Sequence, residues 1–209
     1  MGIKQNNAAN GRMTRSQAKA IPVVLVPGWM DSERTMMSLR NHLRETGIQG
    51  FIASPQPSNG SLPIEEMAQM MADLIYAEFG SEAPINLCGF SMGGLIHRYY
   101  MQRLGGVARV RRFVTIATPH RGTYAGHAWP KIGAQQMRPG SAFLQDLNSD
   151  LAPLEQVEFT SIWSPTDLTI VPTTSSILPV GRAKKVWSPF HAFMPFDSKV
   201  QQAVANALS

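Results

Sequence analysis

The stretch PINLCGFSMGGL, residues 84–95, decides the fold that we expect for this chain of 209 residues. It starts as an apolar run that ends at Cys88, which is typical of a buried strand, and a predicted helix at 92–104 follows. The turn between them, GFSMG at 89–93, has the G-x-S-x-G pattern in the strand–turn–helix context that this pattern requires. Because glycine has no side chain, a tight and strained turn fits here, and it would lift the Ser91 hydroxyl above the sheet.

Strand and helix patterns alternate on both sides of this turn. Apolar or β-branched composition predicts strands at 21–26, 50–53, 84–88, 110–116, 159–163 and 185–187. Apolar residues at three- and four-residue steps predict helices at 36–43, 63–79, 92–104 and 200–208. Strands that are apolar throughout belong to parallel sheets, and strand–helix alternation predicts the α/β class. We therefore expect a doubly wound, mainly parallel sheet with helices on both faces and a site at the carboxyl ends of its strands.

The length and composition predict a single domain. A chain with 44% hydrophobic and 16% charged residues can bury one substantial core, which we assign to residues 21–209. Residues 1–20 form a polar leader that we expect to be flexible, and it lacks the apolar core of a secretory signal peptide. No apolar run is long enough to span a bilayer, so we expect a cytoplasmic or peripheral membrane location.

Charge and cysteine content narrow the range of partners. The formal net charge is +5, but the basic residues are scattered rather than gathered in one stripe, so we expect no nucleic acid partner. Ordinary solvated charge is the simplest explanation, and weak affinity for an anionic membrane surface is the alternative. The lone Cys88 excludes an intrachain disulfide, and His and Cys residues with metal-ligand spacing are absent. We therefore expect no metal and no cofactor, and the sequence does not indicate an oligomeric state.

Ser91 needs partners to react, because a serine hydroxyl at neutral pH requires a base for its proton and an acid to orient that base. In the fold that this motif belongs to, the chain order is serine, acid, histidine, each on a loop after a later strand. His191 follows the last predicted strand and precedes the closing helix, so we predict that it is the base. His97 falls inside the helix after the turn, where we expect a surface or hydrogen-bonded histidine that points away from Ser91.

Asp167 is the predicted acid, because among the acidic residues before His191 it alone comes a few residues after a convincing strand, at 159–163. An aspartate in such a turn often bonds only its own backbone, and that is the alternative role for Asp167. Asp150 is the second choice for the acid.

Attack on an ester carbonyl creates a negatively charged oxygen that preorganised donors must meet. We expect the backbone N–H groups of Met92, directly after Ser91, and of Trp29, in the turn after the first strand. Gly28 would let that turn bend over the site. The Trp29 indole would also give an apolar wall for an acyl chain.

Three segments resemble the bacterial lipase branch of the α/β hydrolases: VLVPGW at 24–29, GFSMGG at 89–94 and ATPHRGT at 117–123. PGSAFL at 139–144 and IVP at 170–172, beside the acid loop, are similar to further lipase segments. The resemblance runs from about residue 21 to the end of the chain. It departs from many such lipases where Pro27 replaces a histidine and where SPFH, residues 188–191, replaces a Gly-His loop.

The resemblance implies a serine hydrolase that cleaves carboxylic esters, above all lipid acyl esters, through an acyl-enzyme. It implies a small cap or lid at about 119–150, with an ordinary surface loop as the alternative, and a His120 that lines the site or braces a neighbouring loop. The expected substrate contacts are Trp29, Met30, His120 and Phe143. Acyl transfer to an acceptor other than water, and a non-catalytic binding protein on the same fold, are the alternative functions.

Overall fold

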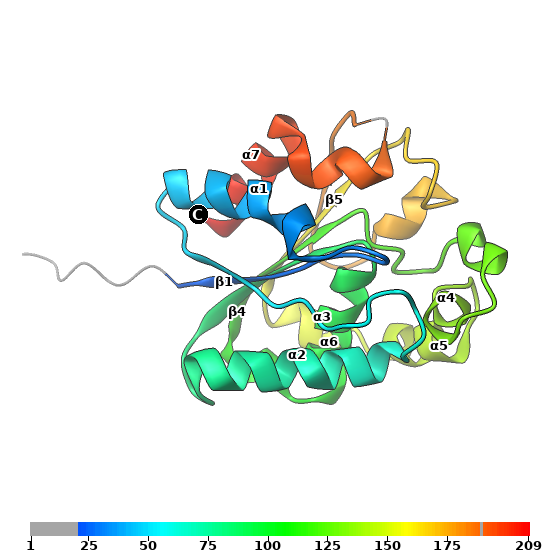
Figure 1. Cartoon of the computed structure of the whole chain (residues 1–209), viewed down its shortest axis with the longest axis horizontal. Coiled ribbons are helices and arrows are strands. Elements are labelled where there is room, and N and C mark those ends of the chain that lie inside the picture. The colour runs from blue at the N-terminus through cyan, green and yellow to red at the C-terminus, as the bar shows by residue number, and fades with distance from the viewer. Residues whose placement is uncertain (1–20, 189) are drawn as a thin grey trace, which may run out of the picture.

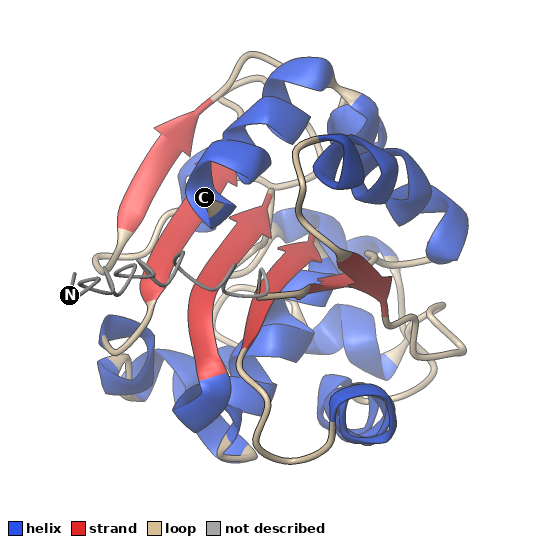
Figure 2. Ribbon diagram, turned by 90° about the vertical axis from the view of Figure 1, so that its left-hand side faces the viewer, coloured by secondary structure: helices blue, strands red, loops and turns tan. Residues whose placement is uncertain are grey.

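The computed structural model describes residues 21–188 and 190–209, so the predicted leader at 1–20 lies outside the described residues. At its centre is a six-stranded sheet in the order β2-β1-β3-β4-β5-β6, in which all neighbouring strands pair in parallel. The strands are β1 (Val23–Val26), β2 (Gly50–Ile52), β3 (Ile85–Phe90), β4 (Val110–Ile116), β5 (Glu158–Trp163) and β6 (Arg182–Lys185). Figure 2 shows this sheet as a middle layer with helices on both sides. The predicted α/β class and the doubly wound parallel sheet are therefore confirmed.

Two layers of helices cover the sheet (Figure 1). The α-helices are α1 (Glu33–Glu45), α2 (Ile64–Phe79), α3 (Met92–Arg103), α4 (Ile132–Gln136), α5 (Ala142–Ser149), α6 (Ala152–Glu155) and α7 (Ser198–Leu208), and the 3-10 turns are η1 (Gly106–Arg109), η2 (Tyr124–Ala128), η3 (Thr173–Ser176) and η4 (His191–Phe196). Helices α1 and α7 cover one face, and α2 and α3 cover the other. The short helices α4 and α5 lie toward the end of the sheet at which the parallel strands finish (Figure 1).

The central position of strand β1 explains why its sequence is apolar throughout. Val24 and Val26 belong to the core that α2 and α3 share, whereas Val23 and Leu25 belong to the core that α1 and α7 share. All four side chains are fully buried. A central parallel strand therefore needs apolar residues at every position, and burial at about 25 cal/mol per Å² stabilises both layers against it.

All strands but β4 differ from their predicted bounds by at least one residue, and the differences at β3 and β6 have clear physical reasons. Strand β3 extends to Phe90 instead of ending at Cys88, because Gly89 and Phe90 still pair with β4. The last strand is Arg182–Lys185 and not 185–187. It is an edge strand with four exposed side chains, so its sequence carries no apolar pattern and backbone pairing with β5 defines it.

None of the helices within 21–188 and 190–209 combines the length and the apolar character that crossing a bilayer requires.

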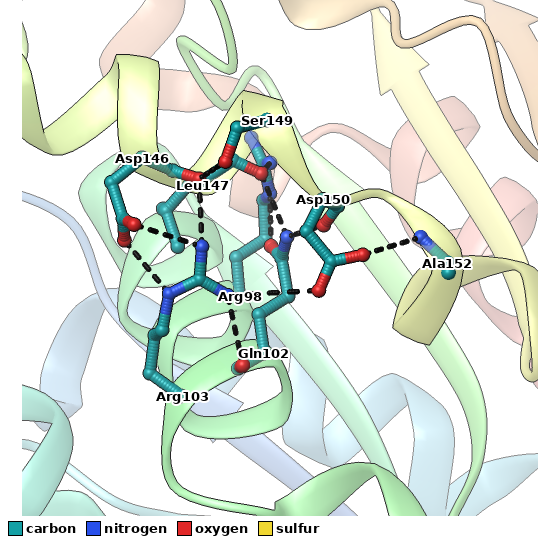
Figure 3. A network of polar contacts seen from close by, with 8 residues as sticks. All are labelled: Arg98, Gln102, Arg103, Asp146, Leu147, Ser149, Asp150 and Ala152. Carbon is teal, nitrogen blue, oxygen red and sulfur yellow. Dashed lines mark hydrogen bonds and ion pairs between the residues drawn. The ribbon is translucent and has the colours of Figure 1, made fainter.

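A buried arginine joins the segment predicted as a cap to α3 (Figure 3). Arg98 is fully buried, and its guanidinium donates to the Leu147 carbonyl at 2.8 Å and to Gln102 Oε1 at 3.0 Å. It also donates to the His120 carbonyl at 3.4 Å. Burial, together with the nearby charge of Arg103, lowers the pKa of Arg98 to about 9, so this side chain stays charged at neutral pH. The cation lies at the last turn of α5, where carbonyl groups lack helical partners.

Replacing Arg98 with Met is expected to lower the free energy of unfolding by about 2–4 kcal/mol, because buried carbonyl groups lose their donor. The matched control is Arg103→Met, which removes the 2.8 Å pair with Asp146 between side chains that are 23% and 52% exposed. Such an exposed pair contributes less than about 1 kcal/mol. Urea unfolding of both variants measures the difference, and equal losses would contradict the role of the buried contact.

Candidate active site

Ser91 occupies a strained turn between β3 and α3. Its φ of 51° and ψ of −120° fall in a region that side chains rarely adopt. Only glycine fits around it, because a Cβ on Gly89 would lie 2.4 Å from the Gly94 nitrogen, and one on Gly93 would lie 2.3 Å from the Val26 carbonyl oxygen. The G-x-S-x-G pattern is therefore a steric requirement of bringing β3, α3 and β1 this close together.

His191 lies within hydrogen-bonding reach of both Ser91 and Asp167. His191 Nε2 is 3.0 Å from Ser91 Oγ, and His191 Nδ1 is 2.7 Å from Asp167 Oδ2. The serine directly follows β3, the aspartate lies in the loop after β5, and the histidine begins η4 after β6. The carboxyl ends of parallel strands share one edge of a sheet, so residues 76 and 24 positions apart in the chain meet there.

The hydrogen bonds of Asp167 determine which nitrogen of His191 carries the proton. Asp167 is 3% exposed, and its Oδ1 accepts from the backbone N–H groups of Thr169 at 2.8 Å and Ile170 at 3.0 Å. Its Oδ2 is left for His191, and because a carboxylate only accepts, Nδ1 of the imidazole must donate. Nε2 is then free to accept the Ser91 hydroxyl proton. Asp167 thus bonds its own turn, as the alternative role required, and also the histidine.

Asp150, the second choice for the acid, lies in a different environment. Its Oδ1 accepts from the Ala152 backbone N–H at 3.2 Å, and its Oδ2 is 3.9 Å from Arg103 Nη1 (Figure 3). The side chain is half exposed and belongs to the surface network that joins α3 to α5. It therefore has no contact with His191.

The turn after β1 lies directly against Ser91. A Cβ on Gly28 would be 3.1 Å from Ser91 Cβ and 3.3 Å from the Phe90 ring, so a side chain there would crowd the site. Within residues 21–188 and 190–209, the backbone N–H groups of Trp29 and Met92 donate to no protein acceptor. Two free donors beside a serine are what a developing oxyanion requires.

Asp31 is a residue of this site that the sequence reasoning missed. Its Oδ2 accepts from the Gly28 N–H at 3.2 Å and its Oδ1 from the Thr35 hydroxyl at 2.9 Å, so it fixes the turn after β1. Burial raises the pKa of this carboxyl, and its hydrogen bonds with Thr35 and Gly28 partly oppose that shift. The available signal was a charged residue two positions after Trp29, inside the turn already assigned to the site.

A cavity of about 240 Å³ opens beside Ser91 and His191. Most of its wall is apolar and includes Trp29, Met30, Phe90, Trp129, Met137 and Ile170. The rings of Trp29 and Trp129 lie 6.1 Å apart, so the turn after β1 and the segment after η2 close over the cavity together. Within the described parts of the chain, no cluster of three or more His, Cys, Asp or Glu residues could hold a metal ion.

His120 and Phe143 do not line this cavity, which corrects their predicted substrate contacts. His120 is fully buried, with Nε2 3.1 Å from Thr115 Oγ1, and its carbonyl accepts from Arg98 and from Asn148 at 3.0 Å. It therefore braces a loop, the second role that was expected. Phe143 is 7% exposed and packs in the core beneath α5, because its position in a helix turns it toward α3 instead of the cavity.

His97 also departs from its prediction as a surface or hydrogen-bonded residue. It is fully buried, and neither ring nitrogen has a hydrogen-bond partner among the described residues. The Phe113 ring meets it edge-on at 6.0 Å. Burial lowers the pKa of His97 to about 3, so the ring is neutral in the folded chain. The helical pattern did not reveal this, because α3 is buried on most of its circumference.

This burial predicts a loss of stability in acid. The folded-state pKa of about 3 lies below the ordinary 6.5, so below pH 6.5 the unfolded chain binds a proton that the folded chain does not. The contribution is absent above pH 6.5, and between there and about pH 3 stability falls by about 1 kcal/mol per pH unit. The free energy of unfolding, measured with urea at pH 7, 6 and 5, should fall less with decreasing pH for His97→Leu than for the wild type.

The matched control for that experiment is His127→Leu, because His127 is exposed. Its free energy of unfolding should fall with decreasing pH by the same amount as that of the wild type. A His97→Leu variant with the wild-type dependence on pH would contradict a neutral, buried imidazole at position 97.

Several solved structures with the same fold are described as lipases or esterases. The mature form of a Bacillus licheniformis lipase superposes with a TM-score of 0.76 at 13% identity, covering 92% of this chain and 93% of the lipase. Aspergillus fumigatus lipase B gives 0.73 at 18% identity, over 90% of this chain and 52% of that protein. A Paleococcus ferrophilus monoacylglycerol lipase gives 0.63 at 12% identity, over 90% and 95%. The chain thus has the α/β-hydrolase fold, as the resemblance in sequence implied.

Sequence comparison defines the family more closely. The family model described as palmitoyl protein thioesterase matches residues 22–151, which is more than half of the chain. The chain belongs to the palmitoyl protein thioesterase family. No curated protein matches it by sequence.

Proposed function

We propose that this protein is a serine hydrolase that cleaves carboxylic esters of hydrophobic acids, with Ser91 as nucleophile, His191 as general base and Asp167 as the orienting acid. One observation carries the proposal: an unbroken pair of hydrogen bonds runs from Ser91 Oγ through the imidazole to a buried carboxylate. Ser91 and His191 lie in the wall of a mostly apolar cavity. A histidine with a purely structural role would not require a partner serine whose backbone is strained.

The acylation step follows from these contacts. As Ser91 Oγ attacks the carbonyl carbon, its proton moves to His191 Nε2, and the charge of the imidazolium faces Asp167. The carbonyl oxygen becomes an oxyanion, which accepts hydrogen bonds from the backbone N–H groups of Trp29 and Met92. Collapse of this intermediate breaks the ester C–O bond, and the departing alcohol takes the proton from His191.

Deacylation repeats the step with water. His191 accepts a proton from water as its oxygen attacks the acyl-Ser91 carbon, and returns that proton to Ser91 Oγ when the acid leaves. An alcohol in place of water would give acyl transfer, which is the second outcome of the same chemistry. Adding glycerol or methanol to the assay separates the two, because transfer diverts product from free acid to a new ester.

The cavity favours short and medium acyl chains. Its volume of about 240 Å³ is below the roughly 300–1,000 Å³ of pockets that enclose drug-sized ligands. Its apolar wall suits the hydrocarbon part of an acyl group, and Asp31, Thr123 and Thr169 provide the few polar groups besides Ser91 and His191. A longer chain would extend past Met30 and Trp129, which are 69% and 50% exposed at the opening.

Thioesters are the second candidate substrate, because the family to which the chain belongs is described as palmitoyl protein thioesterase. The proposed acylation step is the same for a thiol leaving group. Carboxylic esters stand first because the solved lipases and esterases share the fold along almost the whole chain.

Ser91→Ala is expected to lower hydrolysis of p-nitrophenyl butyrate by a thousandfold or more, and Asp167→Asn should cause a loss of similar order. Asp150→Asn is the matched control, since it removes an acidic group from the surface network and should leave the rate within about twofold. Steady-state rates and labelling by a fluorophosphonate probe measure both effects. Equal rates for Asp167→Asn and wild type would remove Asp167 from the proposed site, and no labelling of folded wild-type protein at Ser91 would support a binding protein instead.

A panel of p-nitrophenyl esters from acetate to palmitate, with matched oxygen esters and thioesters of one acid, tests the substrate class. We expect kcat/KM to be highest for chains of about four to ten carbons, because longer chains leave the cavity. The oxygen ester should be cleaved at least as fast as the thioester. Faster turnover of palmitoyl thioesters would shift the function to the second candidate.

A further inference from the structure

Large hydrophobic side chains are exposed on the loops at the edge of the sheet where the cavity lies. Six of them form what we call the apolar rim: Met30, Trp129, Leu168, Trp187, Phe190 and Phe193. Met30 and Trp129 themselves line the cavity, and Leu168, Phe190 and Phe193 each directly adjoin a lining residue in the chain. They come from the loops after β1, β4, β5 and β6, which end at the same edge of the sheet.

The exposure of these side chains is unusually high for their size. Leu168 is 83% exposed, Phe193 64%, Phe190 63% and Trp187 62%. The rings of Phe190 and Phe193 pack edge-on against each other at 6.1 Å, so they form one surface. Each side chain of this kind gains about 1.5–3 kcal/mol on full burial, and a grouped apolar surface of this size marks an interaction site.

Basic residues border the same surface. Strand β6, Arg182–Lys185, exposes all four of its side chains and leads directly to Trp187. Lys185 Nζ lies 5.8 Å from the centre of the Trp187 ring. Neither Lys184 nor Lys185 takes part in an ion pair among the described residues. Their charges are therefore available to an anionic partner.

A lipid surface fits this combination better than a protein does. Tryptophan and phenylalanine beside lysine are the side chains that occupy a membrane interface, with the rings at the acyl boundary and the ammonium groups at the phosphates. Protein interfaces instead deplete lysine. The rim also continues into the cavity, so an acyl chain could pass from a bilayer toward Ser91 without crossing water.

We propose that the apolar rim and the lysines of β6 dock the protein on an anionic lipid surface, with the cavity opening toward the membrane. The inference rests on the proposed function, because the acyl chain of a membrane lipid is the substrate that such docking would deliver. The rings of Trp187 and Phe193 enter the interface, and Lys184 and Lys185 contact headgroup phosphates.

Vesicle sedimentation tests the docking without any need for turnover. The vesicles are made of ether-linked phosphatidylcholine with or without ether-linked phosphatidylglycerol, which offers no ester to cleave. Wild-type protein should bind the anionic vesicles, and Trp187→Ser/Phe193→Ser should weaken binding by about tenfold or more. Lys184→Gln/Lys185→Gln should weaken it about fivefold for each charge removed and should reduce the preference for phosphatidylglycerol.

The matched control is Leu74→Ser/Tyr76→Ser, because these residues are 40% and 66% exposed on α2, away from the cavity. It should bind vesicles like the wild type, and all variants should cleave p-nitrophenyl butyrate at close to the wild-type rate. Equal weakening by the control and the rim variant would overturn the assignment of the surface.

The outcomes separate this inference from the proposed function. Wild-type protein that cleaves soluble esters but ignores both kinds of vesicle overturns the docking and leaves the function in place. Binding to anionic vesicles without ester cleavage supports the docking and refutes the function. A dimer in light scattering that Trp187→Ser/Phe193→Ser makes monomeric, without vesicle binding, would assign the rim to self-association and overturn the proposal.

Discussion

The strained backbone at Ser91 is the constraint on which the site depends. A non-glycine residue at φ 51° costs of order 1–3 kcal/mol and persists only where its surroundings determine it. Here the Ser91 N–H donates to the Ile116 carbonyl at 2.8 Å, and its carbonyl accepts from the Gly94 N–H at 3.1 Å. Neighbouring β4 and the first turn of α3 thus hold both sides of the residue, and the hydroxyl has one fixed position to which the other groups must conform.

His191 and Asp167 reach Ser91 because the parallel sheet brings their loops to one edge. A second set of hydrogen bonds holds those loops together. Ser164, in the acid loop, donates from its hydroxyl to the Ser188 carbonyl at 2.8 Å and accepts from the Ser188 N–H at 3.3 Å. The loops that carry Asp167 and His191 are therefore linked by the Ser164 hydroxyl as well as by the imidazole. Such support reduces the freedom of the histidine, which the proposed catalysis requires.

Sequence reasoning succeeded where the cause is local or follows from chain order. The glycines around Ser91 and the fully apolar β1 have local causes, and the topology that follows from them is confirmed. Asp167 and His191 were selected by their positions after strands, and the structure brings them to Ser91. The edge strand β6 was displaced in the prediction, because an exposed RAKK segment has no pattern that distinguishes it from a loop.

The errors arise where packing decides which way a side chain points. His120 and Phe143 lie in segments assigned to the site, yet His120 is bonded by Arg98 and Phe143 packs in the core beside α3. His97 is buried without a hydrogen bond, which runs against the rule that buried polar groups are paired, so no sequence rule could have placed it there. Asp31 differs from His97, because its carboxyl lies at a mostly apolar cavity but has a hydrogen-bond partner, the Gly28 N–H.

The cavity depends on contacts that lie well outside it. Its wall is closed by Trp129, whose position follows from the chain between β4 and α5. That segment is tied down by Arg98, a buried cation whose described partners are a side-chain amide oxygen and carbonyl groups, without a carboxylate. A carboxylate would satisfy the charge more strongly, but carbonyls at the end of α5 allow one arginine to join three backbone segments. The same helix α3 therefore positions Ser91 at its beginning and the cavity wall through its middle, which links the proposed nucleophile to the cavity beside it.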